Sequence, residues 1–276
     1  MTHDSLGPVA LHDTARYRLE STAVGDEFEI WVAPPIEGFA PVPDSPPEVL
    51  LVLDANLYFG TVVETTRLMH MLYGELPPFF VVGVAYPTRD PLLQGALRTR
   101  DFTPSDDSGF EAMSASMPKT PEIEAITPKM GGASAFLHFL QDEVTPFVAA
   151  RYESSGTTTL FGSSLGGLFV THVLMTDPGA FGRYIAVSPA LWWNQGEILA
   201  AAAPMPVPAA YLAAGGHEES PSIPALAPFR MISNARALAS RLGVTFEVLE
   251  GESHTSVVGP ALTRGLRSLT RAGSGA

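Results

Sequence analysis

Two segments near the amino terminus, residues 16–24 and residues 27–33, alternate between apolar and polar side chains. A period of two is typical of strands that bury one face. The dipeptide Gly25-Asp26 between the segments suits a hairpin turn. The pattern therefore predicts two antiparallel strands, which we expect at the edge of a sheet.

Farther along the chain the apolar residues form short continuous runs, as in residues 49–53 and 79–85. Such runs are typical of parallel strands that are buried on both faces. Residues 61–72 lie between them and have helical spacing, so the three segments predict a right-handed crossover. By the same criteria we expect strands at 157–161, 184–187, 209–213 and 245–249, and helices at 135–152, 165–176, 224–242 and 260–271.

This alternation predicts an α/β fold with a mostly parallel central sheet, helices on both faces and an antiparallel amino-terminal edge. A chain of 276 residues can build one well-buried core, so we expect a single domain over residues 1–276. Residues 99–134 interrupt the pattern, because they have little periodicity. Long irregular connections usually cover a site or move. We therefore expect a lid at 99–134, with a passive insertion as the alternative.

Composition and charge narrow the functional classes. Only 16 residues are Lys or Arg and the net charge is −13, which argues against a nucleic acid or an anionic membrane surface as partner. The lack of cysteine excludes disulfides, thiolate zinc sites and a cysteine nucleophile. Residues 1–17 do not have the pattern of a secretory leader, and no apolar run reaches membrane-spanning length. A soluble cytoplasmic protein is expected, of open oligomeric state.

The segment Gly162-Ser163-Ser164-Leu165-Gly166 has the spacing G-x-S-x-G between a predicted strand and a predicted helix. In this setting the central serine occupies a strained turn that presents its hydroxyl above the sheet. Ser164 has glycine at both second neighbours, whereas Ser163 does not. We expect Ser164 to be a nucleophile and Ser163 to pack or hydrogen-bond locally, and a serine-capped glycine-rich turn is the alternative.

A serine nucleophile needs a base, and histidine suits this role because its pKa is about 6.5. His254 follows the last predicted strand on a loop before the final predicted helix, where α/β-hydrolases keep their base. We therefore expect His254 to be the base. The other histidines lie near the amino terminus, within predicted helices or in the turn after residues 209–213, and they are His3, His12, His70, His138, His172 and His217.

The third member of a triad should be a carboxylate that orients the histidine, at a strand end between nucleophile and base. The turn at residues 215–219 supplies two carboxylates, Glu218 and Glu219. We favour Glu218, with Glu219 as the alternative. Ser164, Glu218 and His254 then follow the serine, acid, histidine order that is expected for α/β-hydrolases.

Backbone N–H groups are expected to form an oxyanion hole. The N–H of Leu165, at a helix start, points to where negative charge develops on the attacked carbonyl. A second donor is expected in the loop after residues 49–53, where the N–H of Asn56 or of Leu57 is suitable. Asp54, in the same loop, is expected to make structural hydrogen bonds and to stay outside the triad.

Several segments combine into a family pattern, namely residues 52–59, 98–104, 131–133 with Phe136, Phe139 and Leu140, 161–167, 188–193 and 251–254. Together they resemble the esterase branch of the α/β-hydrolases that includes bacterial siderophore esterases, such as the enterobactin and bacillibactin trilactone hydrolases. The similarity spans most of the chain. It implies hydrolysis of a small-molecule ester by Ser164 and His254, without a metal or organic cofactor.

The resemblance also implies that Arg98, Tyr58 and Trp193 lie near the substrate. Arg98 could equally pair with Asp101, and Trp193 could pack in the core together with its neighbour Trp192. The chain departs from the family where Ala55 replaces a frequent glycine and where two adjacent glutamates leave the acid ambiguous.

The sequence thus predicts a serine carboxylesterase, with a siderophore trilactone as a candidate substrate. Two alternatives keep the same fold. An acyltransferase would pass the acyl group from Ser164 to an alcohol, and a non-catalytic binding protein would retain only the architecture.

Overall fold

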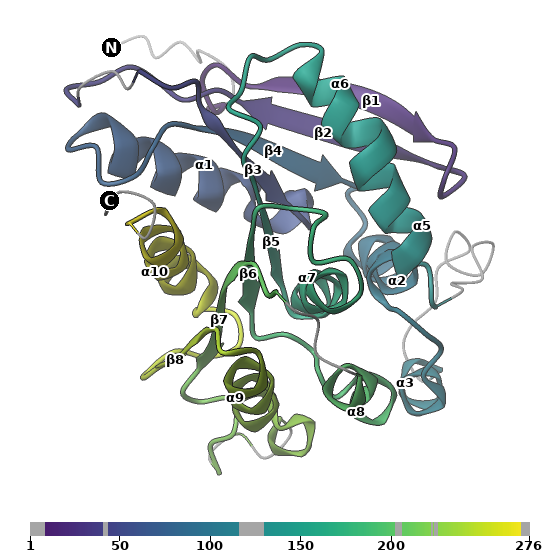
Figure 1. Ribbon diagram of the computed structural model, residues 1–276. Helices are drawn as coiled ribbons and strands as arrows, with labels where there is room; N and C mark the ends of the chain where they lie inside the picture. The colour runs from purple at the N-terminus through teal and green to yellow at the C-terminus, as the bar shows by residue number, and fades with distance from the viewer. Residues whose placement is uncertain are drawn as a thin grey trace, which may run out of the picture.

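Eight strands of the described residues form one sheet at the centre of the computed structural model (Figure 1). The structure describes residues 9–40, 44–115, 130–201, 206–221, 223 and 226–271. The strands are β1 (Ala15–Ser21), β2 (Asp26–Ala33), β3 (Glu48–Val52), β4 (Phe79–Ala85), β5 (Thr158–Ser163), β6 (Arg183–Val187), β7 (Ala209–Gly215) and β8 (Thr245–Leu249). Their order is β1-β2-β4-β3-β5-β6-β7-β8, so β1 and β8 are the edges.

The two strand directions divide the sheet into a small antiparallel part and a large parallel part. β2 pairs antiparallel with both β1 and β4. The pairs from β4 through β3, β5, β6 and β7 to β8 are all parallel. The predicted mostly parallel sheet with an antiparallel amino-terminal edge is therefore confirmed.

Helices cover both faces of the sheet (Figure 1). One face packs against α1 (Ala55–Met71) and α10 (Val258–Arg271). The helical elements that the structure describes elsewhere are α2 (Pro91–Phe102), α3 (Ser108–Ser114), α5 (Ala133–His138), the π-helix η1 (Phe139–Val144), α6 (Thr145–Ala149), α7 (Leu165–Thr176), α8 (Trp193–Ala200), the 3₁₀ turn η2 (Ala227–Phe229) and α9 (Met231–Leu242). Of these, α5, α7 and α9 pack on the opposite face. Within the described ranges, no helix is both long and apolar enough to cross a membrane.

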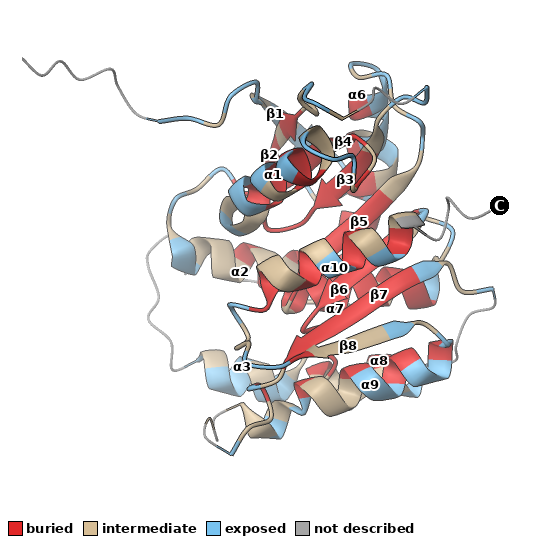
Figure 2. Ribbon diagram, turned by 90° about the vertical axis from the view of Figure 1, so that its left-hand side faces the viewer, coloured by how far each residue is buried: buried red, intermediate tan, exposed pale blue. Residues whose placement is uncertain are grey.

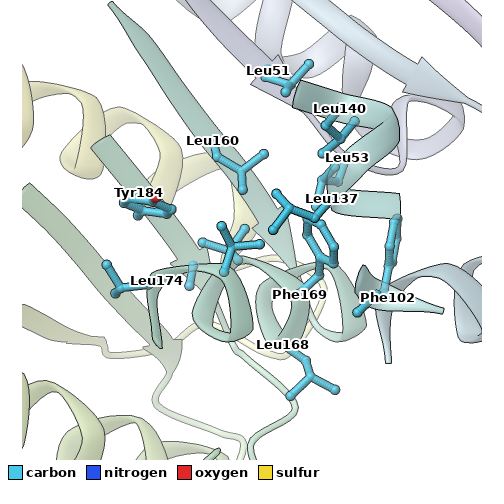
Figure 3. Close-up of a cluster of buried hydrophobic side chains, with 14 of the residues drawn as sticks. Leu51, Leu53, Phe102, Leu137, Leu140, Leu160, Leu168, Phe169, Leu174 and Tyr184 are labelled. Carbon is cyan, nitrogen blue, oxygen red and sulfur yellow. The ribbon is translucent and has the colours of Figure 1, made fainter. Parts of the chain in front are cut away.

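The inner strands are buried on both faces, and Figure 2 shows β5, β6 and β7 mostly in red, whereas the edge strand β8 is mainly tan. Figure 3 shows Leu51 of β3, Leu160 of β5 and Tyr184 of β6 on the side that faces α7. Phe169 of α7 contacts the ring of Phe102, at 5.9 Å between centroids. Each such buried side chain contributes roughly 1.5–3 kcal/mol of transfer free energy. The packing of α7 on β5 fixes the turn between these two elements.

All the predicted strands are present, and the helix predicted at 165–176 has those bounds as α7. The helix predicted at 61–72 begins earlier, at Ala55. Its N-cap Asp54 adopts a left-handed conformation, with φ 52°, and so turns the chain from β3 directly into α1. The turn after β3 is therefore much shorter than the sequence suggested.

The segment 99–134, predicted as irregular, is in part helical. α2 begins at Pro91 and continues to Phe102, and the Asp90 carboxylate caps it by accepting from the Leu92 N–H at 2.9 Å. α3 follows a second cap, Asp107. Proline at the first helical position and an aspartate cap are both start signals that the sequence carries. Residues 116–129 lie outside the described residues, so the lid stays a prediction.

Candidate active site

The carboxyl ends of four neighbouring strands bring the predicted catalytic residues to one edge of the sheet. Ser164 follows β5, Ser188 follows β6, the turn with Glu218 follows β7, and the loop with His254 follows β8. Because these strands are parallel, all four connections start at the same edge. This edge is where open α/β sheets bind their ligands.

Ser164 occupies the sharp turn that the G-x-S-x-G spacing predicted. Its φ of 59° and ψ of −117° are rare for a residue with a side chain, and such strain is typical of a nucleophile turn. A Cβ on Gly162 would lie 2.4 Å from the carbonyl oxygen of Gly166, so only glycine allows this turn to close. The Ser164 N–H donates to the Val187 carbonyl at 2.9 Å, which attaches the turn to the end of β6.

The neighbouring Ser163 is the last residue of β5 and is buried. Its side chain lies near that of Tyr58. This buried position at the strand end agrees with the local packing that the sequence predicted for Ser163.

The two N–H groups predicted for the oxyanion hole are both available. Within the described residues, neither the Leu165 N–H nor the Asn56 N–H has a hydrogen-bond partner. The alternative donor, the N–H of Leu57, is instead bonded to the Asp54 carbonyl at 2.8 Å. The Asn56 side chain is fixed by Tyr86, whose carbonyl it donates to at 3.0 Å and whose N–H it accepts from at 2.8 Å. Of the two candidates in this loop, Asn56 is the one with a free N–H.

Glu218 and His254 are in direct contact. Nδ1 of His254 lies 2.8 Å from Oε2 of Glu218, whose side chain is 0% exposed, while that of His254 is 29% exposed. Glu219 lies elsewhere, because its carboxylate accepts from the N–H and the hydroxyl of Ser233 in the first turn of α9, at 2.6 and 2.7 Å. Of the two adjacent glutamates, Glu218 is the one that contacts the histidine.

The loop that carries His254 is bound to the turn after β7. The Gly216 N–H donates to the Leu249 carbonyl at 2.9 Å, and the His217 N–H donates to the Glu252 carbonyl at 3.0 Å. These bonds hold the two segments of chain at a defined separation. The Ser164 hydroxyl does not cap α7. Hydrogen bonds connect the nucleophile turn to His254 through the end of β6 and Glu218.

Arg98 is bound within the protein. Its guanidinium donates to both carboxylate oxygens of Asp54, at 2.9 and 2.8 Å. The predicted alternative partner, Asp101, binds Arg100 and accepts from the Tyr86 hydroxyl. The pairing of Arg98 with Asp101 is therefore wrong. Burial lowers the pKa of Arg98, but the charge of Asp54 outweighs burial and the pKa is raised overall.

Trp193 is 0% exposed, and its indole N–H donates to the Ser105 carbonyl at 3.0 Å. The complete burial of this side chain favours the core-packing alternative. Its predicted contact with substrate stays a prediction. Its neighbour Trp192 is half-buried and contacts Phe229 with tilted rings, at 4.7 Å between ring centroids.

Tyr58 is half-buried beside the nucleophile turn. Burial raises the pKa of its hydroxyl, and the nearby charge of Asp54 raises it further, so the phenol stays protonated. Its predicted contact with substrate stays a prediction. Among the described residues, no group of three or more histidine, aspartate or glutamate side chains is arranged to hold a metal ion.

Sequence reasoning missed two groups at this edge, Ser188 and the N–H of Gly215. Both contact Glu218. The position of Ser188 could have indicated it, because this residue directly follows β6, which lies between the nucleophile strand β5 and the acid strand β7.

Comparison with known proteins finds similar esterases. The family model described as "Putative esterase" matches residues 100–253. Ferri-bacillibactin esterase BesA of Bacillus subtilis is 33% identical over 83% of this chain and 82% of its own length. The siderophore enterobactin esterase of Emericella nidulans is 32% identical over 79% of this chain and 80% of its own. The crystal structure of BES protein from Bacillus cereus has a TM-score of 0.77 and 30% identity, and covers 97% of this chain and 99% of that one. The chain therefore belongs to this esterase family, has an α/β-hydrolase fold and is a carboxylic ester hydrolase.

Proposed function

We propose that the chain hydrolyses its ester through an acyl-enzyme on Ser164, with His254 as base and Glu218 as the orienting acid. The Ser164 hydroxyl attacks the ester carbonyl carbon, and its proton passes to Nε2 of His254. Collapse of the tetrahedral intermediate breaks the bond to the alcohol oxygen, which takes the proton from His254. Water then attacks the acyl-serine in the same way, which releases the acid and regenerates the hydroxyl.

The observation that carries this proposal is the 2.8 Å contact between Nδ1 of His254 and Oε2 of Glu218. A proton on Nδ1 is held by the buried carboxylate, so the lone pair of Nε2 is available to the serine proton. The same carboxylate stabilises the imidazolium that forms. Glu219 has no part in the proposed triad, because it binds Ser233.

Two backbone N–H groups that could bind the oxygen of the attacked carbonyl support the same mechanism. The N–H groups of Leu165 and Asn56 lie at the starts of α7 and α1, and neither is bonded within the described residues. In the proposal they stabilise the oxyanion of the tetrahedral intermediate. Removing one donor of this kind from a serine hydrolase costs roughly 10²- to 10³-fold in kcat.

We infer that the substrate is a siderophore ester, of which a trilactone is the first candidate. Three relatives support this choice. The ferri-bacillibactin esterase and the enterobactin esterase are 33% and 32% identical to the chain. The siderophore triacetylfusarinine C esterase of Aspergillus fumigatus is 29% identical over 94% of each chain.

The decisive experiment assays the purified protein on enterobactin and bacillibactin, each with and without bound iron, beside p-nitrophenyl esters of graded chain length. We expect the trilactones to be hydrolysed with the higher kcat/KM. Ser164→Ala and His254→Ala should each lower kcat by ~10⁴-fold or more, and the double variant should lose little beyond either single one, because both residues serve one step.

The ester assay, together with labelling by a fluorophosphonate probe, tests the alternatives. Preferred transfer of the acyl group to an added alcohol would assign an acyltransferase. A fluorophosphonate probe that labels the protein but not Ser164→Ala supports the nucleophile. Wild-type turnover by Ser164→Ala would exclude the proposed mechanism.

A further inference from the structure

Ser188 lies directly after β6, between the nucleophile strand β5 and the acid strand β7. Its side chain is 0% exposed. Its φ is 43°, in the left-handed region that residues with a Cβ rarely adopt. A serine kept in a conformation that suits glycine indicates that the hydroxyl itself is needed at this position.

That hydroxyl is bonded to the proposed triad acid. Oγ of Ser188 donates to Oε1 of Glu218 at 2.5 Å. The N–H of Gly215 donates to the same oxygen at 2.6 Å. A rotation of the carboxylate would break both hydrogen bonds to Oε1. In the observed orientation its other oxygen, Oε2, faces Nδ1 of His254.

The backbone of Ser188 fixes its hydroxyl relative to both neighbouring strands. The Ser188 N–H donates to the Ala213 carbonyl in β7 at 2.7 Å. On the other side, the preceding residue, Val187, accepts from the Ser164 N–H at 2.9 Å. Two consecutive residues thus connect the nucleophile turn to the strand that precedes the acid.

Gly215 completes the arrangement because it has no side chain. A Cβ at this position would lie 2.6 Å from the carbonyl oxygen of Glu252 and 2.8 Å from that of Ser253. The loop that leads into His254 therefore packs directly on the Gly215 backbone. The Gly215 N–H thus donates to Glu218. The lack of a side chain on Gly215 also allows the loop that carries His254 to pack close to β7.

We propose that Ser188 is a positioning residue for the ester hydrolysis, whose hydroxyl holds the Glu218 carboxylate in the rotamer that orients His254. This inference rests on the proposed triad. Ser188 touches neither the substrate nor the nucleophile hydroxyl in this scheme, and it acts through Glu218 alone.

Two substitutions at position 188 distinguish the effect of the hydroxyl from the effect of the strained backbone. Ser188→Ala removes the hydroxyl and keeps the strained φ, whereas Ser188→Gly removes it and relieves the strain. We expect both variants to lower kcat by about 10- to 100-fold, the equivalent of one lost hydrogen bond to a charged group. KM should change less than about twofold, because the substrate loses no contact. Ser188→Gly should unfold at the same temperature as Ser188→Ala or at a higher one.

A double-mutant cycle tests whether Ser188 acts through the acid. In a Glu218→Ala background, Ser188→Ala should lower kcat no further. Thr66→Ala is the matched control, because it removes another buried hydroxyl, which donates to the Val62 and Val63 carbonyls in α1. This control should keep the wild-type kcat.

The outcomes distinguish the two proposals. If Ser188→Gly keeps the wild-type kcat while Glu218→Ala is impaired, the positioning role is wrong and the triad stands. A full additional loss from Ser188→Ala in the Glu218→Ala background would likewise overturn it, because the hydroxyl would then act independently. If Ser164→Ala and Glu218→Ala both keep the wild-type kcat, the proposed function fails and the role of Ser188 fails with it.

Discussion

The guanidinium of Arg98 and the carboxylate of Asp54 form a paired set of hydrogen bonds, at 2.9 and 2.8 Å, between α2 and the start of α1. The pair lies next to the nucleophile turn, because a Cβ on Gly166 would lie 3.3 Å from Oδ2 of Asp54. The side chains of Arg98 and Asp54 are only 17% and 4% exposed. This buried ion pair therefore packs directly against the nucleophile turn.

Breaking this pair should destabilise the fold. Arg98→Met leaves the Asp54 carboxylate buried without a counterion, and we expect the free energy of unfolding to fall by roughly 3–5 kcal/mol. Urea denaturation measures the loss. Adding Asp54→Asn, which removes the orphaned charge and tolerates the left-handed backbone, should restore part of it.

The exposed pair of Arg18 and Glu27 is the matched control, because the Arg18 side chain is 71% exposed. Arg18→Met should cost about 1 kcal/mol or less. A stable Arg98→Met protein with a raised KM would instead make Arg98 a substrate contact.

Alanine substitutions of Glu218 and Glu219 should have different effects, one on kcat and the other on stability. Glu218→Ala removes the partner of His254, and we expect kcat to fall by roughly 10²- to 10⁴-fold. Glu219→Ala removes a cap at the first turn of α9, so it should leave kcat unchanged and cost about 1 kcal/mol of stability. Steady-state kinetics and thermal unfolding on both variants make the comparison. A loss of kcat confined to Glu219→Ala would contradict the assignment.

Glycine at position 215 should be needed for activity more than for folding. Gly215→Ala forces the loop of residues 252–253 away from β7 and moves the base relative to the nucleophile. We expect kcat to drop by about 10²-fold, since a displacement of about 1 Å can have that effect. The matched control is Gly60→Ala, because Gly60 lies within α1 with nothing within 4 Å of an added Cβ. That change should keep kcat and stabilise the helix by about 0.5–1 kcal/mol.

His172 should make the fold sensitive to mild acid. Burial lowers its pKa below the ordinary value of 6.5, and the nearby charge of Glu197 only partly opposes this. The unfolded chain then binds the proton more readily, so stability is complete above pH about 6.5 and falls as the pH decreases toward the folded pKa. Chemical denaturation between pH 7 and pH 5 should show a smaller loss for His172→Gln than for wild type. Equal losses would mean that His172 does not contribute.

The parts of the fold that depend on local pattern could be predicted from the sequence. The strand β4 and the helix α7 have the bounds that their apolar patterns indicated. Ser164 and His254 can be chosen as candidates from the sequence because their positions follow from the order of strands, and a parallel sheet brings strand ends to one edge. The preference for Glu218 over Glu219 rested on the same order, and its contact with His254 is a geometric fact of the structure.

The parts that depend on distant partners could not be predicted. Arg98 pairs with Asp54, 44 residues away. The nearby Asp101 instead binds Arg100. Trp193 became a core residue because the chain at Ser105 covers it. The bond from Ser188 to Glu218 spans 30 residues. No local pattern encodes such pairings, since they arise from how whole elements pack.

The edge strands β1 and β8 also affect whether copies of the protein associate at high concentration. Arg16 and Arg18 project from β1 as exposed charges, and Glu247 of β8 forms an ion pair with Arg264. A strand of another copy that paired with β1 or β8 would have to desolvate these charged side chains. Charged borders of this kind discourage fibril-like stacking, so the open sheet is protected from the aggregation that unpaired β-edges invite.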